Sequence, residues 1–388
     1  MDDLSFILTH LGEERENYFH AISPPIIQSS NFGFKTVNEL RTKIVHEKKH
    51  HIYTRGNNPT TSILRQKLAS LEHADDSLVF GSGSAAVAAA FLSQLKSGDH
   101  IISINSAYSW TIKLISAFLP RFGVTHTFVQ GNNVKDFELA IRPNTKIIYL
   151  ESPSTMLFEL QDLQAVAKLA KANNIITILD NSCASAYFQK PLDLGIDIVV
   201  HSGTKYFNGH SDVVMGVVCA KQSIIDHMFA SEFMTLGAIL SPHDAYLAIR
   251  GLRTYQVRME RAQQSGLEVA TFLNTHPKIQ QVNYVWGPWH PQHDLAKQQM
   301  NGAGGLFSIL LNASSIPEVE AFVERLKRFI IAVSWGGHES LILPVAAFYN
   351  IPGNRQPQNP WNLIRIYIGL EDPKLLIEDL NQSLEHVH

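Results

Sequence analysis

The chain has 388 residues, of which 45% are hydrophobic and 17% charged, and its formal net charge is −3. This composition predicts roughly two or three folded domains, excludes a disordered chain and argues against nucleic acid as a partner. The two cysteines, Cys183 and Cys219, lack the spacing of metal ligands, so neither a disulfide framework nor a metal site is expected. Because the first residues lack a secretory pattern and no apolar run could span a membrane, we expect a cytoplasmic protein that binds no membrane.

The hydrophobic pattern of the chain changes near residue 59. Residues 1–58 are polar and irregular, with one expected helix at 36–46, and form an expected N-terminal arm. Short apolar runs then alternate with helical patterns, and the expected strands are 77–80, 100–104, 126–129, 146–150, 175–179, 197–201 and 213–219. Because these runs lack polar alternation, they predict strands buried on both faces, in a mostly parallel sheet of about seven strands.

A helical pattern dominates from residue 241 onward. Residues 241–276 read as one long amphipathic stretch, followed by further elements, namely strands at 301–311, 325–334 and 363–368 and a helix at 373–385. This order predicts a smaller α/β domain at the C-terminal end. The expected division is an arm at 1–58, a large domain at 59–250 and a C-terminal domain at 251–388.

Two polar features follow the first expected strands, at the edge where open α/β sheets bind ligands. Gly83 and Ser84 lie in GSGSAA, which opens an apolar helix, and their backbone N–H groups could bind a phosphate. A close-packed turn would have the same composition. Tyr108, in NSAYSWT, could stack on a planar ring or could simply pack against its neighbours.

Two further features follow later strands. Asp180 ends the apolar run IITILD and could keep a pyridine nitrogen protonated, or could cap a turn. Lys205 follows DIVVH in SGTK, where desolvation would make its amine a nucleophile, and the hydroxyls of Ser202 and Thr204 suit a phosphate. Taken together, the four features supply a phosphate cradle, a ring stack, a counter-charge and an amine. The set predicts a pyridoxal 5′-phosphate (PLP) site.

The stretch around HSGTKYFNGHSD closely resembles the Cys/Met-metabolism, or trans-sulfuration, family of PLP enzymes. The resemblance extends from PPIIQSSNFGF to LIRIYIGLEDPKLLIEDL. It implies the aspartate-aminotransferase fold, fold type I of PLP enzymes, and a homotetramer built as a dimer of dimers. It also implies that Lys205 binds the cofactor covalently. The other cofactor-binding residues that it implies are Tyr53, Arg55, Gly83, Ser84, Tyr108, Asp180, Ser202 and Thr204.

The resemblance further implies how substrate is held. Tyr53 and Arg55, in YTRGNNPT, are similar to the pair that reaches the phosphate of the neighbouring subunit. Ser334 and Arg365 are similar to residues that contact the substrate carboxylate, and Lys205 with Tyr108 would be catalytic. The expected substrate is a sulfur amino acid.

Segments of the chain resemble different members of the family. ESPSTMLFE at 151–159 and Trp335 favour bacterial cystathionine β-lyase, whereas LSPHDAYLAIRGLRT resembles methionine γ-lyases. We therefore expect β-elimination on L-cystathionine or a related cysteine conjugate, giving a thiol, pyruvate and ammonia, as in methionine biosynthesis. The alternatives are γ-elimination or γ-replacement and, from another class, a binding protein that uses the PLP fold. The roles of Trp110, Trp335 and His338 in selectivity stay open.

Overall fold

A computed structural model describes residues 3–352 and 356–387 of the chain. Its main feature is a seven-stranded sheet with the order β1-β7-β6-β5-β4-β2-β3, in which β7 runs antiparallel to its neighbours and all other pairs are parallel. The strands are β1 (Asp76–Phe80), β2 (His100–Ile104), β3 (Thr125–Val129), β4 (Thr145–Glu151), β5 (Ile176–Asp180), β6 (Ile198–Ser202) and β7 (Gly216–Ala220). The mostly parallel sheet expected from the sequence is confirmed.

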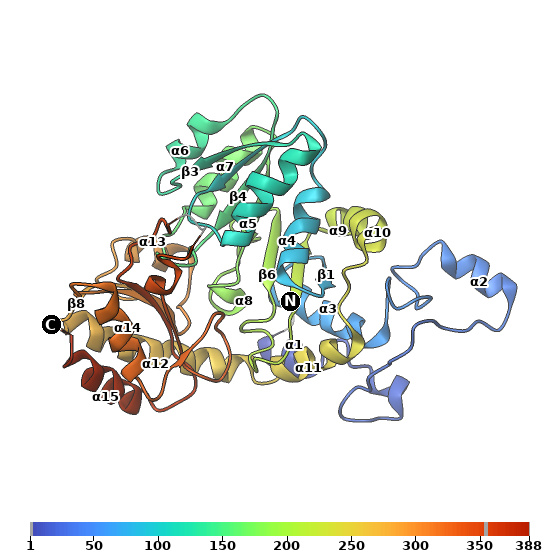
Figure 1. The fold of residues 1–388 in the computed structure, drawn as a ribbon. Coiled ribbons are helices and arrows are strands. Elements are labelled where there is room, and N and C mark those ends of the chain that lie inside the picture. Colours follow the sequence, from blue (N-terminus) through green and yellow to red (C-terminus); the bar gives the residue numbers. More distant parts are fainter. Residues whose placement is uncertain (1–2, 353–355, 388) are drawn as a thin grey trace.

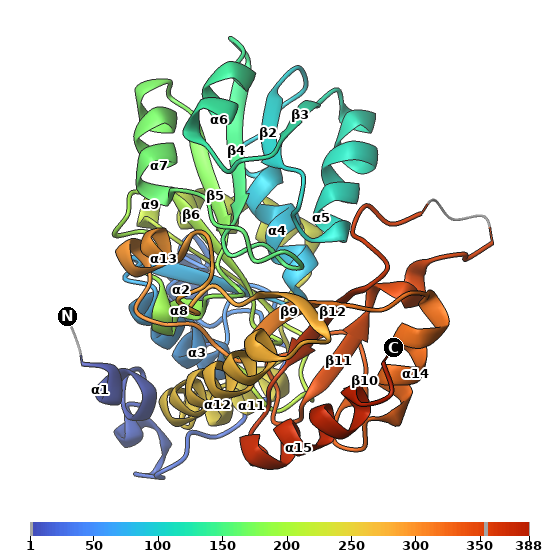
Figure 2. The ribbon, with the colours of Figure 1, turned by 90° about the vertical axis from the view of Figure 1, so that its left-hand side faces the viewer.

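Helices cover this sheet because its strands are apolar on both faces. α4 packs on β6 and β7, and α7 packs on β5 (Figures 1 and 2). The helices of this half are α3 (Pro59–Leu71), α4 (Gly83–Leu92), α5 (Ser109–Lys113), η2 (Leu114–Phe118), η3 (Leu119–Phe122), α6 (Val134–Ala140), α7 (Leu163–Ala172), α8 (Ser185–Phe188), α9 (Gln222–Met228), η4 (Phe229–Phe233) and α10 (Met234–Leu236).

A second sheet of five strands forms the C-terminal part, with the order β10-β11-β12-β9-β8. Figure 2 shows it below the large sheet, with α14 and α15 nearby. The strands are β8 (Ile279–Asn283), β9 (Leu306–Leu311), β10 (Ile330–Ile331), β11 (Leu341–Pro344) and β12 (Leu363–Tyr367). The remaining helices are α11 (Pro242–Leu252), α12 (Tyr255–Thr275), α13 (His293–Gln299), α14 (Ile316–Arg325), η5 (Val345–Phe348) and α15 (Pro373–Leu384). The large sheet lies in one hydrophobic core, which also includes Leu306, Leu341 and Tyr367 of the small sheet, and the other buried apolar residues of the small sheet belong to a second core.

The expected long helix at 241–276 is divided into two. α11 ends at Leu252 and α12 begins at Tyr255, because the guanidinium of Arg258 and the hydroxyl of Thr254 both donate to the carbonyl of Gly251. α12 then runs along the bottom of the molecule to β8 and β9 (Figure 1).

Two expected C-terminal strands are shorter in the structure. β9 begins only at Leu306, because 302–305 is a glycine-rich segment packed so closely that a Cβ at Gly304 would lie 2.1 Å from the phenol oxygen of Tyr206. Of the expected strand at 325–334, only Ile330 and Ile331 pair, because the backbone N–H groups before them donate to Asp379 of α15. β8 and β11 were not expected.

The N-terminal segment projects from the body, carrying α2 (Val37–Ile44) at its far end (Figure 1). It begins with α1 (Leu4–Thr9) and η1 (Arg15–Tyr18), and α1 packs on α3. Large apolar side chains are exposed along it, including Phe19, Ile22, Val37 and Val45. Within the described residues, no helix is both long and apolar enough to cross a membrane.

Candidate cofactor site

Three strands of the large sheet end in polar side chains at one edge. β4 ends at Glu151, β5 at Asp180 and β6 at Ser202, and Glu151 is paired in register with Asp180. Because these strands are parallel, their carboxyl ends meet, as in other open α/β sheets that bind ligands there. Lys205 follows β6 directly, so the topology gathers the predicted residues of 180–205 at this edge.

Lys205 lies where the two sheets meet. Its ammonium donates a hydrogen bond of 2.5 Å to Ser334 Oγ and lies 5.6 Å from the ring centroid of Trp335. Gly336, with φ +90°, passes so close that an added Cβ would lie 2.9 Å from Lys205 Cα. Burial, with the charge of Arg365 adding to it, lowers the pKa of Lys205 to about 8. An amine with this pKa is partly neutral near pH 7 and can act as nucleophile and base.

Asp180 lies on the strand beside Lys205. Its carboxylate accepts a 2.9 Å hydrogen bond from the backbone N–H of Ser182. Burial raises the pKa of Asp180, while this hydrogen bond and the positive charges of His201 and Lys205 act in the opposite direction. A protonated pyridine nitrogen beside the carboxylate would favour its ionised form further.

The first turn of α4 makes a cradle next to β6. Ser82 caps the helix, because its hydroxyl accepts a hydrogen bond from the N–H of Ala85 at 3.1 Å. The N–H groups of Gly83 and Ser84 belong to the first turn and have no intrahelical partners. A Cβ at Gly83 would lie 3.0 Å from Ser202 Cβ, so the helix approaches the strand as closely as glycine permits. Among the described residues the Ser202 hydroxyl has no hydrogen-bond partner, so this donor set fits a phosphate.

Thr204 differs from Ser202 in that its hydroxyl already has hydrogen-bond partners in the protein. Its hydroxyl donates to the carbonyl of Met215 at 3.2 Å and accepts from the N–H of the same residue at 2.9 Å. It thus braces the loop that carries Lys205, and its only hydroxyl hydrogen is already used.

Tyr108 lies just before α5 with 44% of its surface exposed. Its backbone N–H donates to Glu151 Oε2 at 2.8 Å, which fixes the start of α5 against the end of β4. Burial raises the pKa of its phenol. The exposed ring is free to stack on a planar group.

Arg365 reaches the site from the middle of the small sheet. It lies on β12, and its guanidinium donates to the carbonyl of Ser334 at 3.2 Å. Burial lowers its pKa to about 10. That hydrogen bond is its only one within the described part of the chain, so most of its planar donor set can bind a carboxylate.

The predicted pair Tyr53 and Arg55 lies on the projecting N-terminal segment. The Arg55 guanidinium lies 5.3 Å from the Tyr53 ring centroid, and the ring is 46% exposed. No hydrogen bond or ion pair among the described residues joins this pair to Lys205 or Asp180 of the same chain.

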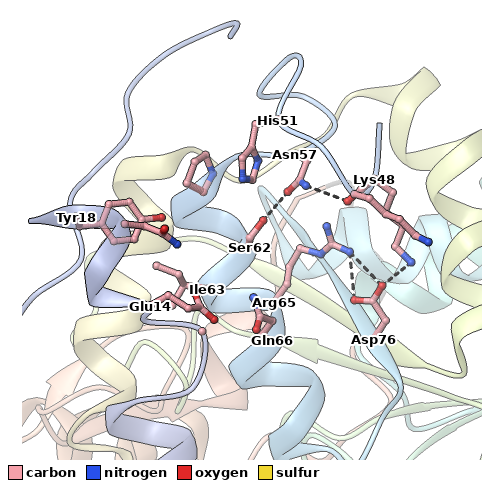
Figure 3. Close-up of a pocket in the computed structure, with 14 residues that line it drawn as sticks. Glu14, Tyr18, Lys48, His51, Asn57, Ser62, Ile63, Arg65, Gln66 and Asp76 are labelled. Atoms are coloured by element: carbon pink, nitrogen blue, oxygen red, sulfur yellow. Dashed lines mark hydrogen bonds and ion pairs between the residues drawn. The ribbon is translucent and has the colours of Figure 1, made fainter. Parts of the chain in front are cut away.

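A separate cavity of about 350 Å³ lies between this segment and α3 (Figure 3). Its charged walls largely neutralise one another, because Asp76 accepts hydrogen bonds from Arg65 at 3.2 Å and pairs with Lys48 at 2.5 Å. Tyr18 and His51 line its other side. None of the residues predicted for the cofactor lines this cavity.

Sequence reasoning missed two buried groups beside the site. Glu151 is 5% exposed and follows an apolar strand just as Asp180 does, so the same rule could have found it. His201 and Glu72 form a buried pair of 2.5 Å behind Asp180. Because Glu72 is distant in sequence, only the fold reveals that pair. Among the described residues, no group of three or more His, Cys, Asp or Glu side chains could hold a metal ion.

The meeting of an amine, a carboxylate and a helix N-terminus at the edge of this sheet defines the class: a PLP enzyme of fold type I. The chain belongs to the family described as Cys/Met metabolism PLP-dependent enzymes, whose sequence profile matches residues 6–385. It is a PLP-dependent lyase of this family, as the resemblance in the sequence implied.

Similar proteins cover almost the whole chain. An L-methionine gamma-lyase of Fusobacterium nucleatum is 37% identical over 378 residues, covering 96% of this chain and 95% of its own. A cystathionine gamma-lyase of Mus musculus is 38% identical, covering 98% and 94%. The crystal structure of metB from Corynebacterium glutamicum has a TM-score of 0.93 and 37% identity, covering 100% of this chain and 99% of its own.

Proposed function

We propose that the chain is a carbon–sulfur lyase for L-cystathionine or a related sulfur amino acid. The observation that carries this proposal is the position of Lys205 between the two sheets, where the charges of Asp180 and Arg365 both act on it. This arrangement supplies a base, a counter-charge and a carboxylate-binding group around one space. The similar proteins that are named as lyases support the same reaction class.

Different residues would bind the cofactor and the substrate. Gly83, Ser84 and Ser202 would hold the phosphate, and Asp180 would face the pyridine nitrogen. When bound, PLP supplies an electron sink that makes the substrate α-proton acidic. Arg365 would bind the substrate carboxylate with its planar donors and so fix the α-carbon in front of Lys205.

The proton transfers fall to Lys205. Its Nζ would remove the α-proton, because a pKa near 8 leaves part of the amine neutral at pH 7. Ser334 Oγ accepts a hydrogen bond from this nitrogen and would hold it in place. Tyr108 would assist the departing thiolate through its exposed phenol.

Two reactions remain candidates within this class. γ-Elimination is our leading proposal, because the named relatives are γ-lyases. It needs a second proton removed at the β-carbon, for which Lys205 would serve again. The β-elimination expected from the sequence is the second candidate, supported by the segment 151–159 and by Trp335, whose ring lies over the amine of Lys205.

The deciding experiment is identification of the keto acid formed from L-cystathionine by the PLP-loaded enzyme. 2-Oxobutyrate with cysteine would establish γ-elimination, and pyruvate with homocysteine would establish β-elimination. Lys205→Ala is the control and should form neither. No keto acid from cystathionine, methionine or cysteine conjugates, with PLP demonstrably bound, would refute the lyase proposal and favour γ-replacement or a binding protein.

We propose a homotetramer, built as a dimer of dimers, in which the projecting segment reaches a second copy. Its exposed apolar side chains support this, and so does the lack, among the described residues, of a hydrogen bond or ion pair between Tyr53 or Arg55 and Lys205 or Asp180 of their own chain. Light scattering would measure the assembly. Mixing Arg55→Ala with Lys205→Ala subunits should restore activity if one site uses both chains, and should restore none if each chain is self-sufficient.

A further inference from the structure

Glu151 lies at the heart of the site, yet none of the roles above uses it. It is the last residue of β4 and is paired in register with Asp180, the last residue of β5. Residues paired in register on neighbouring parallel strands point to the same face, with their backbones about 4.8 Å apart. The two carboxyl groups are therefore neighbours in a space with little water.

A buried carboxyl group and a partly buried one beside it cannot both ionise cheaply, because each negative charge raises the cost of the other. Burial and the charge of Asp180 raise the pKa of Glu151 to about 8, against hydrogen bonds from the backbone of Tyr108 and Thr155. Within the described part of the chain, the titratable groups that interact electrostatically with Glu151 include Asp180 on β5, Cys183 after it, Arg365 on β12, Tyr108 before α5 and Tyr149 on β4.

The surroundings favour ionisation of Asp180 over Glu151. Asp180 has His201 and Lys205 as positive neighbours, whereas the positive charge acting on Glu151 is that of Arg365. Arg365 is also the group whose donors would bind the substrate carboxylate. Bound substrate would thus compete for a positive charge that favours ionised Glu151.

We propose that Glu151 is a positioning residue that stays protonated at neutral pH, so that the Glu151–Asp180 pair carries one negative charge, on Asp180. Its second task is to hold Tyr108. The Oε2 atom accepts a hydrogen bond from the backbone N–H of Tyr108 at 2.8 Å, and this bond would fix the position of the exposed ring that stacks on the cofactor. Glu151 would contact no reacting atom and would act through Asp180 and Tyr108.

Three substitutions separate charge from geometry. Glu151→Gln is neutral, keeps the length and keeps an oxygen that can accept from Tyr108. Glu151→Asp keeps an ionisable group but is too short by one methylene, and Glu151→Ala removes the acceptor. The readouts are the dissociation constant of PLP and the visible circular dichroism of the bound cofactor, which reports how firmly its ring is held.

At pH 7 we expect the Gln variant to bind PLP within about twofold of the wild type, and the Asp and Ala variants to bind about tenfold more weakly with a reduced dichroic band. Between pH 7 and 9 the wild-type spectrum should change as Glu151 ionises, and this change should be smaller in the Gln variant. If the Asp and Ala variants do not fold, the Gln variant and its pH titration still decide.

Two results would overturn the proposal. A Gln variant that releases PLP at pH 7 as readily as the Ala variant would mean that Glu151 acts as an anion. Three variants indistinguishable from the wild type would mean that it positions nothing. The inference rests on the chain being a PLP enzyme but not on the reaction, so a failed cystathionine assay with normal PLP binding would leave it intact.

Discussion

Ser334 accepts a hydrogen bond of 2.5 Å from the ammonium of Lys205, 129 residues away in sequence. Its backbone carbonyl accepts a second one, from Arg365, at 3.2 Å. One residue with φ +74° thus holds both the amine on the large sheet and the guanidinium on the small sheet. The two halves of the site keep their relative position through this link.

Ser334→Ala should lower kcat/KM by about tenfold, because Lys205 loses its acceptor and the amine becomes less ordered. Alanine has the same backbone cost at this φ as serine, so the comparison isolates the hydroxyl. Ser334→Gly, which relaxes the backbone but also lacks the hydroxyl, is the second variant. Activity retained in both would remove Ser334 from the site.

Covalent capture of PLP by the apoenzyme should accelerate as the pH rises from 6 to 8 and level off above. The neutral amine is the nucleophile, and the pKa of Lys205 is lowered from 10.5 to about 8. Stopped-flow absorbance would measure the rate. Nα-acetyl-lysine, whose one amine is the side-chain amine, is the reference and should keep accelerating toward pH 10. A protein profile that matches Nα-acetyl-lysine would contradict the lowered pKa.

Arg365→Lys should raise KM for the substrate by about tenfold or more while lowering kcat less, because an ammonium cannot reproduce the planar two-pronged contact with a carboxylate. Steady-state kinetics would measure both constants. The PLP absorption spectrum should be unchanged, which separates loss of substrate binding from loss of the cofactor. An unaltered KM would place the carboxylate elsewhere.

Gly83→Ala should weaken PLP binding by about tenfold, because its methyl group would press on Ser202 and shift the first turn of α4 by a few tenths of an ångström. Ser84→Ala is the matched control, since the proposed contact at that position is a backbone N–H and the side chain is exposed. An equal loss in Ser84→Ala would show that the Ser84 hydroxyl, and not its backbone N–H alone, binds the phosphate.

Glu151→Gln should stabilise the apoenzyme increasingly as the pH rises from 5 to 8. Unfolded glutamate ionises near its ordinary pKa, whereas the folded pKa is raised to about 8, so the unfolded chain releases its proton first and stability falls between these values. Glutamine does not ionise, so the variant lacks this loss of stability. Melting temperatures of both proteins at pH 5, 6, 7 and 8 would test the trend, and a constant difference would contradict it.

The sequence alone determined the elements and part of the chemistry. Apolar runs such as IITILD are buried on both faces, so their lack of alternation predicted the parallel strands and their order along the chain. Lys205 and Asp180 were identifiable because each directly follows or ends a buried strand, and strand ends meet at one edge of the sheet. GSGSAA similarly marked the start of α4.

Only the tertiary structure decided which distant residues meet. Nothing in the local pattern joins Ser334 to Lys205 or Glu72 to His201, because these contacts depend on how two sheets pack. The sequence also did not predict the break between α11 and α12, because it depends on Arg258 of α12, which donates a hydrogen bond to the carbonyl of Gly251 in α11. Glu151 shows the same limit. The sequence shows that Glu151 ends an apolar run. Its proposed role, however, depends on the charge of Asp180 on the adjacent strand, and the sequence pattern does not show which strands are neighbours.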